Sequence, residues 1–218
     1  MARGLFITLE GPDGSGKSTQ ARLLAERVRA AGHEVLENRE PGGTPIGMQI
    51  RRVLLDSQNQ ELSPTAELLL MFASRAQNVD QWILPALAQG KVVISDRFTD
   101  SSLVYQGIVR GLGAELVYEV DRIACRGLVP EVTFVVDVDT DTGLARARHR
   151  NVRTETVETR LDEQSIAFHR KAREAFLGLV QDEPKRIHLI DGARDPDVVA
   201  ADIWTVVDPL IKARSWPA

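Results

Sequence analysis

The chain alternates between short runs of hydrophobic residues and longer segments with helical periodicity. Most of the short runs are continuously hydrophobic, which is typical of strands that are buried on both faces of a parallel sheet. The five runs are GLFITLE (4–10), HEVLENRE (33–40), KVVISDR (91–97), VTFVVDVD (132–139) and RIHLIDG (186–192). Because helical segments separate them, the sequence predicts a doubly wound α/β fold, with a five-stranded parallel sheet flanked by helices.

Helix signals support this alternation. A first helix is predicted from Lys17 to Ala31, with Gly32 as its C-terminal stop. The longest helix should begin near Ser63, an N-cap residue followed by Pro64 at the first helical position. Ligands of such sheets bind at the carboxyl ends of the strands, where the strand order reverses. Candidate chemistry is therefore expected just after each strand.

Length and composition favour a single soluble domain. The 218 residues, of which 43% are hydrophobic, suffice for one core, so we predict one domain over residues 1–218. A net charge of −4 disfavours a nucleic-acid-coating protein, and any bound anion must be held by local basic clusters. Cys125 is the only cysteine, so an internal disulfide is excluded. No hydrophobic stretch reaches the roughly 20 residues of a membrane span, and we expect a cytoplasmic protein without membrane partners.

The segment EGPDGSGKST (10–19) follows the first predicted strand. Its glycines, lysine and serine fit the phosphate-loop pattern G-x-x-x-x-G-K-[ST], which predicts binding of a nucleoside triphosphate. Lys17 should contact the β- and γ-phosphates, and Ser18 should ligate Mg²⁺. The candidate nucleotide-binding residues are Gly11, Asp13, Gly14, Ser15, Gly16, Lys17, Ser18 and Thr19. A switch GTPase is a rival, but its guanine-selecting N-K-x-D is absent from the chain.

Charged residues follow two further strands. Asp96 ends the third run, where an acid commonly belongs to the magnesium shell, and Arg97 offers a forked donor for a second phosphate. The alternative for this pair is a surface ion pair. Arg39 and Arg51, near REPGGTP (39–45), are candidates for a second anion site, and a solvated helix face is the alternative for them.

A basic strip follows the fourth strand. Between residues 146 and 160 it carries five arginines, Arg146, Arg148, Arg150, Arg153 and Arg160, against two glutamates. We predict a small mobile lid over about residues 146–160 that delivers arginines to a triphosphate when it closes. An exposed helix with internal salt bridges is the alternative.

Two anion sites imply phosphoryl transfer between two phosphorylated molecules. A phosphate acceptor has a second pKa of about 6 and is mostly dianionic at neutral pH, so it requires no catalytic base. The enzyme must instead screen charge and align the groups. Lys17, Arg97 and Mg²⁺ are candidates for screening, and the transition-state cation should come from the lid, through Arg148, Arg150 or Arg153.

Five segments carry a resemblance to a known family. EGPDGSGKST, REPGGTP, FASRAQ, SDRFTDSSLVYQG and RLDEQSIAFHRKAREAFL resemble bacterial thymidylate kinases in order and spacing along nearly the whole chain. The phosphate loop alone indicates only a large superfamily, whereas SDRFTDSSLVYQG together with REPGGT is more specific. The resemblance implies transfer of the γ-phosphoryl group of ATP to dTMP with Mg²⁺, usually by a homodimer. There are two alternatives: another nucleoside monophosphate or deoxynucleoside kinase, and a nucleotide-dependent binding or switch protein.

The resemblance also implies roles on the acceptor side. Asp13 would accept a hydrogen bond from the 3′-hydroxyl of dTMP, which explains a carboxylate inside a phosphate loop. Arg97 and Arg51 would hold the acceptor phosphate. Tyr105 would lie against the 2′ carbon of the sugar and disfavour a ribose. The residues implied to read the edge of thymine are Arg75, Ser102 and Gln106.

The chain departs from the family at one position. Relatives often carry a phenylalanine four residues before the arginine that matches Arg75, where it stacks on thymine, but this chain has Met71 there and Phe72 next to it. Residues i and i+4 share a helix face, so Met71 is the natural partner of Arg75, although Phe72 could contribute. A helix-core position is the alternative for both. Arg146 is a candidate for stacking on adenine.

Overall fold

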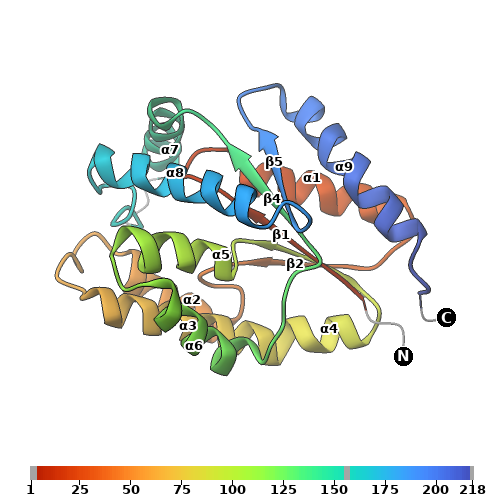
Figure 1. Ribbon diagram of the computed structural model, residues 1–218, viewed down its shortest axis with the longest axis horizontal. Coiled ribbons are helices and arrows are strands. Elements are labelled where there is room, and N and C mark those ends of the chain that lie inside the picture. The colour runs from red at the N-terminus through yellow and green to blue at the C-terminus, as the bar shows by residue number, and fades with distance from the viewer. Residues whose placement is uncertain (1–3, 155–157, 217–218) are drawn as a thin grey trace.

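The computed structural model describes residues 4–154 and 158–216 of the chain. Its centre is a five-stranded parallel sheet with the strand order β2-β3-β1-β4-β5 (Figure 1). The strands are β1 (Leu5–Glu10), β2 (Val35–Arg39), β3 (Val92–Asp96), β4 (Val132–Asp137) and β5 (Ile187–Asp191). Each strand lies within the hydrophobic run that predicted it, so the predicted fold class is confirmed.

Helices cover both faces of the sheet. On one face lie α1 (Lys17–Ala30) and α9 (Pro196–Lys212); on the other lie α3 (Pro64–Asn78), α4 (Leu84–Ala88), α6 (Ala114–Cys125) and α8 (Ile166–Asp182) (Figure 1). Side chains alternate along β1, so that Leu5, Ile7 and Leu9 enter the core under α1 and α9. Phe6 enters the opposite core. Burial on both faces explains why this run is continuously hydrophobic.

The predicted helix ends are close to the observed ones. Helix α1 ends at Ala30, one residue earlier than predicted, and Gly32 has the left-handed φ of 90° that favours glycine. The Ser63 hydroxyl accepts a hydrogen bond from the Ala66 amide and caps α3. Helix α3 continues through the π-helical segment η1 (Val79–Ile83) into α4, so this run is the longest in the described part of the chain.

The remaining elements follow the carboxyl ends of β2, β3 and β4. They are α2 (Pro45–Leu55), α5 (Thr99–Ser102), the π-helical segment η2 (Leu103–Val109) and α7 (Thr140–Thr154). Strand β1 lies in the middle, with β3 and β2 on one side and β4 and β5 on the other, so the strand order reverses at β1. The carboxyl end of β1 is therefore the place to look for a ligand site.

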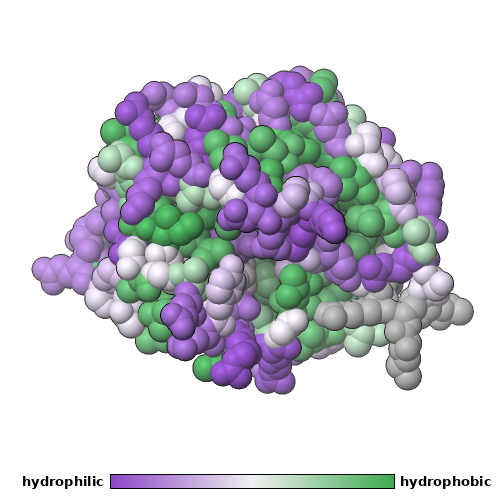
Figure 2. All heavy atoms as spheres, in the orientation of Figure 1, coloured by the Kyte–Doolittle hydropathy of each residue, from purple (hydrophilic) through white to green (hydrophobic). Residues whose placement is uncertain are grey.

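The surface is mixed in character. Figure 2 shows hydrophilic side chains distributed over the whole visible face, with hydrophobic ones between them. Within residues 4–154 and 158–216, none of the helices combines the length and the hydrophobicity that a membrane span requires.

Candidate active site

A cavity of about 550 Å³ opens at the carboxyl edge of the sheet, beside β1 and β3. Most of the predicted site residues line it, although they come from seven segments of the chain. These are Asp13, Gly14, Ser15, Gly16, Lys17, Ser18, Thr19, Arg39, Arg51, Met71, Arg75, Asp96, Arg97, Ser102, Tyr105, Gln106, Arg146 and Arg150. Gly11, Phe72, Arg148 and Arg153 lie outside this lining.

The loop between β1 and α1 is built for close backbone packing. Gly11 and Gly14 have φ values of 129° and 73°, a region that side chains rarely allow. A Cβ atom on Gly14 would lie 2.0 Å from the carbonyl oxygen of Gly143, and one on Gly11 would lie 2.3 Å from that of Val136. The loop therefore fits tightly against the start of α7 and against β4, and it leads directly into the N-terminus of α1, where amide groups favour anions.

Lys17 is folded into its own loop. Its Nζ donates hydrogen bonds to the carbonyl oxygen of Pro12 at 2.6 Å and to Ser15 Oγ at 3.4 Å. Burial, assisted by the charge of Arg97, lowers the pKa of the Lys17 ammonium to about 8, because nearby carboxylates compensate only in part. Lys17 is therefore mainly charged at neutral pH and can reach a phosphate held by the loop.

Ser18 and Asp96 meet beside the loop. The Ser18 hydroxyl donates a hydrogen bond to the carboxylate of Asp96, which ends β3 and pairs in register with Leu9 of β1. Hydroxyl and carboxylate oxygens are ligands that Mg²⁺ prefers. Within the described residues, no group of three or more His, Cys, Asp or Glu side chains could hold a metal ion. A metal ion at this place would therefore take its other ligands from a nucleotide and from water.

Arg97 connects the phosphate loop with α5 through hydrogen bonds to both. Its backbone has a left-handed φ of 73°, which is unusual for a residue other than glycine and turns the chain sharply after β3. The guanidinium donates to Asp13 Oδ1 at 2.6 Å, to the Gly11 carbonyl at 3.1 Å and to Ser101 Oγ at 2.9 Å. Tyr105 donates its hydroxyl to Asp13 Oδ2 at 3.3 Å.

The carboxylate of Asp13 is stabilised by its surroundings. Burial raises the pKa of Asp13, but the charges of Arg97 and Lys17 outweigh this effect, and the pKa lies below its ordinary value. Asp13 is therefore an ionised acceptor that faces the cavity from the phosphate loop.

Glu10 supports the turn that carries Arg97. This side chain is completely buried and accepts hydrogen bonds from the Phe98 amide at 2.7 Å and from Ser101 Oγ at 2.5 Å. Burial, followed by the nearby charge of Asp100, raises the pKa of Glu10 to about 8. Glu10 was not among the predicted site residues. The signal that could have identified it is an acidic residue at the end of a hydrophobic strand.

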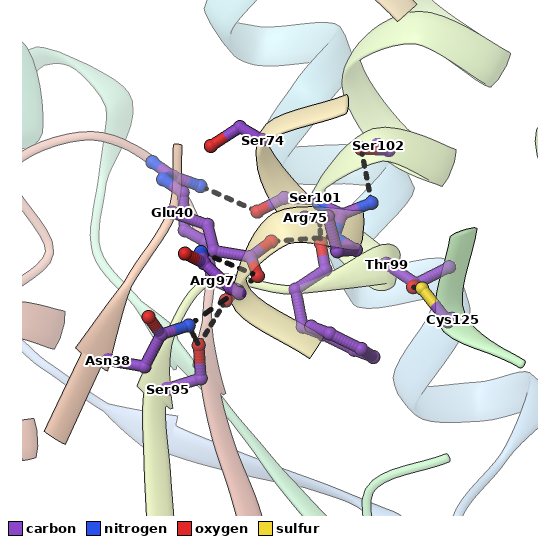
Figure 3. A network of polar contacts seen from close by, with 12 residues as sticks. Asn38, Glu40, Ser74, Arg75, Ser95, Arg97, Thr99, Ser101, Ser102 and Cys125 are labelled. Carbon is purple, nitrogen blue, oxygen red and sulfur yellow. Dashed lines mark hydrogen bonds and ion pairs between the residues drawn. The ribbon is translucent and has the colours of Figure 1, made fainter. Parts of the chain in front are cut away.

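Arg75 is held by a buried network (Figure 3). Its Nε donates to Glu40 Oε2 at 2.6 Å, one terminal nitrogen donates to Ser102 Oγ at 3.1 Å, and the other to the Phe98 carbonyl at 2.9 Å. The Arg75 and Glu40 side chains are each only 2% exposed. Glu40 lies within the REPGGTP segment, but the sequence predicted no role for it.

Phe72 and Met71, which are neighbours in α3, have different surroundings. The guanidinium of Arg75 lies over the Phe72 ring, with its central carbon 4.5 Å from the ring centroid. Phe72 belongs to the large hydrophobic core beside the sheet, whereas Met71 packs in a small cluster with Leu54 and Leu55 and also lines the cavity. Of these two residues, only Met71 lines the cavity.

A second cationic group lies at the other side of the cavity. Arg51 donates from Nε to Glu158 Oε2 at 2.9 Å and from a terminal nitrogen to the Pro41 carbonyl at 2.8 Å. Arg39 lines the same wall, where burial and the charge of Arg51 lower its pKa. The structure therefore brings Arg39 and Arg51 together, as expected of an anion site.

The lid arginines divide into three groups. Arg146 donates to the Gly192 carbonyl at 3.0 Å and Arg150 to Asp162 at 3.1 Å, and both line the cavity. Arg148 and Arg153 are exposed on α7. Arg160 is buried and forms an ion pair with Glu67. Residues 155–157 of the predicted lid lie outside the described residues.

Other lining residues were also missed. Glu158 of the lid segment lines the cavity, as do Asp162, two residues after that segment, and Arg194, after β5. The rule that ligand residues follow the strands could have found Arg194, because it comes three residues after Asp191, which ends β5.

The sheet order, the glycine-rich loop and the cavity define a phosphate-loop nucleotide-binding protein. A family model described as thymidylate kinase matches residues 9–203 of the chain. The chain is 46% identical over 200 residues to the thymidylate kinase of Syntrophotalea carbinolica, covering 91% of this chain and 93% of that protein. It is 45% identical over 207 residues to the thymidylate kinase of Deinococcus radiodurans, covering 95% and 98%.

A solved structure agrees. The thymidylate kinase from Ehrlichia chaffeensis superposes with a TM-score of 0.75 at 31% identity, covering 94% of this chain and 99% of that one. The chain belongs to the thymidylate kinase family and is a phosphotransferase.

Proposed function

We propose that the protein transfers the γ-phosphoryl group of ATP to dTMP, with Mg²⁺, and produces ADP and dTDP. The observation that carries this proposal is that two separate cationic groups face one cavity. Lys17 and the phosphate loop form the first, and Arg39 and Arg51 form the second. Arg97, which donates to Asp13 and Gly11 of the loop, lines the same cavity. A protein that only binds a triphosphate has no use for the second group.

The donor side consists of the loop and its neighbours. Backbone amides of the loop and the Lys17 ammonium would hold the β- and γ-phosphates of ATP. The fit to Mg²⁺ rests on the adjacent oxygens of Ser18 and Asp96, which would hold the ion, and the ion would neutralise phosphate charge there. Arg146, which donates to the Gly192 carbonyl and lines the cavity, would stack on the adenine of ATP.

The acceptor side consists of the arginines and α3. Arg97 and Arg51 would hold the acceptor phosphate, and Asp13 would accept a hydrogen bond from the 3′-hydroxyl, next to Tyr105. Met71 would cover one face of thymine, because it lines the cavity. The residues that would read the edge of the base are Arg75, Ser102 and Gln106.

The chemical step needs charge screening more than acid–base catalysis. An oxygen of the dTMP phosphate attacks the γ-phosphorus, the bond from that phosphorus to the β-phosphate oxygen breaks, and ADP leaves with the electron pair. Repulsion between the two anions opposes the approach, and Lys17, Arg97 and Arg150 would offset it in a water-poor cavity. Arg148 and Arg153 could take part only if α7 moves toward the cavity.

We also propose a homodimer in the cytoplasm, on the resemblance to bacterial thymidylate kinases. Exposed hydrophobic side chains on the neighbouring helices α3 and α6 support a contact with a second copy: Leu69, Tyr118 and Ile123 are 53%, 52% and 73% exposed. Sedimentation equilibrium gives the mass directly, and a monomer at micromolar concentration would refute the dimer.

The reaction is tested by ADP release with ATP, Mg²⁺ and a panel of acceptors: dTMP, dUMP, ribothymidine monophosphate, dCMP, dGMP, AMP and thymidine. We expect a strong preference for dTMP. Preference for a different monophosphate would assign another nucleoside monophosphate kinase, and nucleotide binding without transfer would assign a switch protein. Lys17→Ala should abolish transfer in a folded protein, whereas Arg22→Ala, at an exposed helix position, should not.

A further inference from the structure

Glu67 is a buried carboxylate that has none of the roles described above. It lies in the first turn of α3 and is completely buried. Its Oε1 accepts hydrogen bonds from Gln106 Nε2 at 2.8 Å and from Arg110 Nε at 3.3 Å. Its Oε2 accepts one from Arg110 at 3.1 Å and lies 2.7 Å from a terminal nitrogen of Arg160. Glu67 therefore joins three segments that are distant in the sequence.

This carboxylate is held in its ionised form. Burial raises the pKa of Glu67, but the hydrogen bonds from Gln106 and Arg110 and the charges of both arginines outweigh burial, and the pKa lies below its ordinary value. An ionised carboxylate can accept hydrogen bonds but cannot donate one.

The charge of Glu67 decides which way the Gln106 amide faces. Gln106 is 1% exposed and lines the cavity, so its amide has little freedom to move. A partner that only accepts must face the amide nitrogen, and the amide oxygen is then turned away from Glu67. Gln106 consequently offers the cavity a hydrogen-bond acceptor.

We propose that Glu67 is a specificity-determining positioning residue, which fixes the Gln106 amide so that the base pocket accepts a hydrogen bond from pyrimidine N3–H. The inference rests on the proposed function, in which Gln106 reads the edge of the acceptor base. Thymine and uracil carry a hydrogen on N3, whereas cytosine has a lone pair there and an amino donor at position 4. Cytosine would place its N3 lone pair against the Gln106 oxygen, so Glu67 would exclude dCMP while admitting dTMP and dUMP.

The variant Glu67→Gln makes a specific prediction. The buried Arg160 favours an oxygen at the place of Oε2, so the new amide nitrogen would face Gln106. Gln106 would then reverse its amide and present N–H groups to the base. Because a buried hydrogen bond to thymine is replaced by two opposed donors, kcat/KM for dTMP and dUMP should fall by about tenfold or more, and that for dCMP should rise.

The matched control is Arg110→Gln. It removes two hydrogen bonds from Glu67 but leaves the Gln106 contact in place, so it should lower stability without changing the dTMP/dCMP ratio. Glu67→Gln alone adds one net positive charge to the buried cluster. The double variant Glu67→Gln/Arg110→Gln restores the net charge and supplies a second protein for the test if the single variant does not fold.

The test measures kcat/KM for dTMP, dUMP and dCMP in the wild type and in these variants. A dTMP/dCMP ratio that falls in Glu67→Gln or in the double variant, but not in Arg110→Gln, supports the proposal. A purely structural role would scale all three acceptors by one factor, and an unchanged ratio in a folded Glu67 variant overturns the proposal. Failure of the wild type to phosphorylate dTMP would instead refute the proposed function itself.

Discussion

Replacing Glu40 by glutamine tests the buried network that holds Arg75. Both side chains are 2% exposed and their ionic contact is 2.6 Å long, so the guanidinium has almost no access to water. In Glu40→Gln the arginine keeps an amide oxygen as acceptor but loses its counter-ion. Removing one partner of a buried ion pair typically costs about 3–5 kcal/mol, and the retained acceptor places this variant at about 3 kcal/mol.

The corresponding change in melting temperature is large enough to measure easily. For a chain of this size, a destabilisation of about 3 kcal/mol lowers Tm by roughly 6–12 °C. Thermal and urea unfolding, followed by circular dichroism, give the free energy of unfolding. The matched control is Glu26→Gln, which breaks the pair with Arg22 that is more than half exposed on both sides and should cost less than about 0.5 kcal/mol.

The same variant should affect the acceptor side. Arg75 also donates to Ser102 and to the Phe98 carbonyl, and both contacts depend on the direction that Glu40 gives to the guanidinium. We therefore expect a higher KM for dTMP and an unchanged KM for ATP. If Glu40→Gln unfolds within about 1 °C of Glu26→Gln, the charge of Glu40 adds no more to stability than an exposed ion pair does.

Three further predictions follow from other charged groups. Because burial lowers the pKa of Lys17 to about 8, kcat/KM for ATP should fall as the pH rises through 8, and a profile that is flat to pH 9.5 would contradict this. Glu158→Gln removes the charged partner of Arg51 and should lower the KM for dTMP about fivefold in steady-state assays, whereas a higher KM would refute competition for this arginine. Burial raises the pKa of Glu10 from 4.5 to about 8, so the folded state keeps a proton that the unfolded state releases. Wild-type stability should therefore decline relative to Glu10→Gln between about pH 5 and 8, by on the order of 4 kcal/mol, and urea unfolding at both pH values checks the sign.

The sheet and the phosphate loop could be predicted because their signals are local. A strand buried on both faces must be hydrophobic throughout, and β1 and β3 show this directly in the sequence. The phosphate-loop pattern has fixed spacing between its glycines and Lys17, because the backbone amides and the lysine of such a loop must converge on one anion. Short-range chemistry of this kind is visible without knowledge of the tertiary structure.

The buried carboxylates could not be predicted, because their partners are distant in the sequence. Glu40 and Arg75 are 35 positions apart, and Glu67 and Arg160 meet only because α3 packs against the base of the lid segment. In the sequence, a glutamate in the first turn of a helix is typical of an exposed position that favours the helix dipole. The sequence placed Arg160 in the basic strip of the lid, but its partner Glu67 is completely buried.

The ion pairs inside the cavity explain why the phosphate loop contains a carboxylate. Arg97 donates to Asp13, and the Arg51 guanidinium contacts Glu158, so an acceptor phosphate would replace a protein carboxylate at each arginine. Once Arg97 turns to the phosphate, Asp13 would be a partly buried anion that has lost its charged donor, which is costly. A hydroxyl at the 3′ position of the sugar would replace that donor, together with Tyr105. Binding of the acceptor phosphate would therefore remove a donor from Asp13, and the sugar hydroxyl would replace that donor. The phosphate and the sugar of one nucleotide would then bind cooperatively.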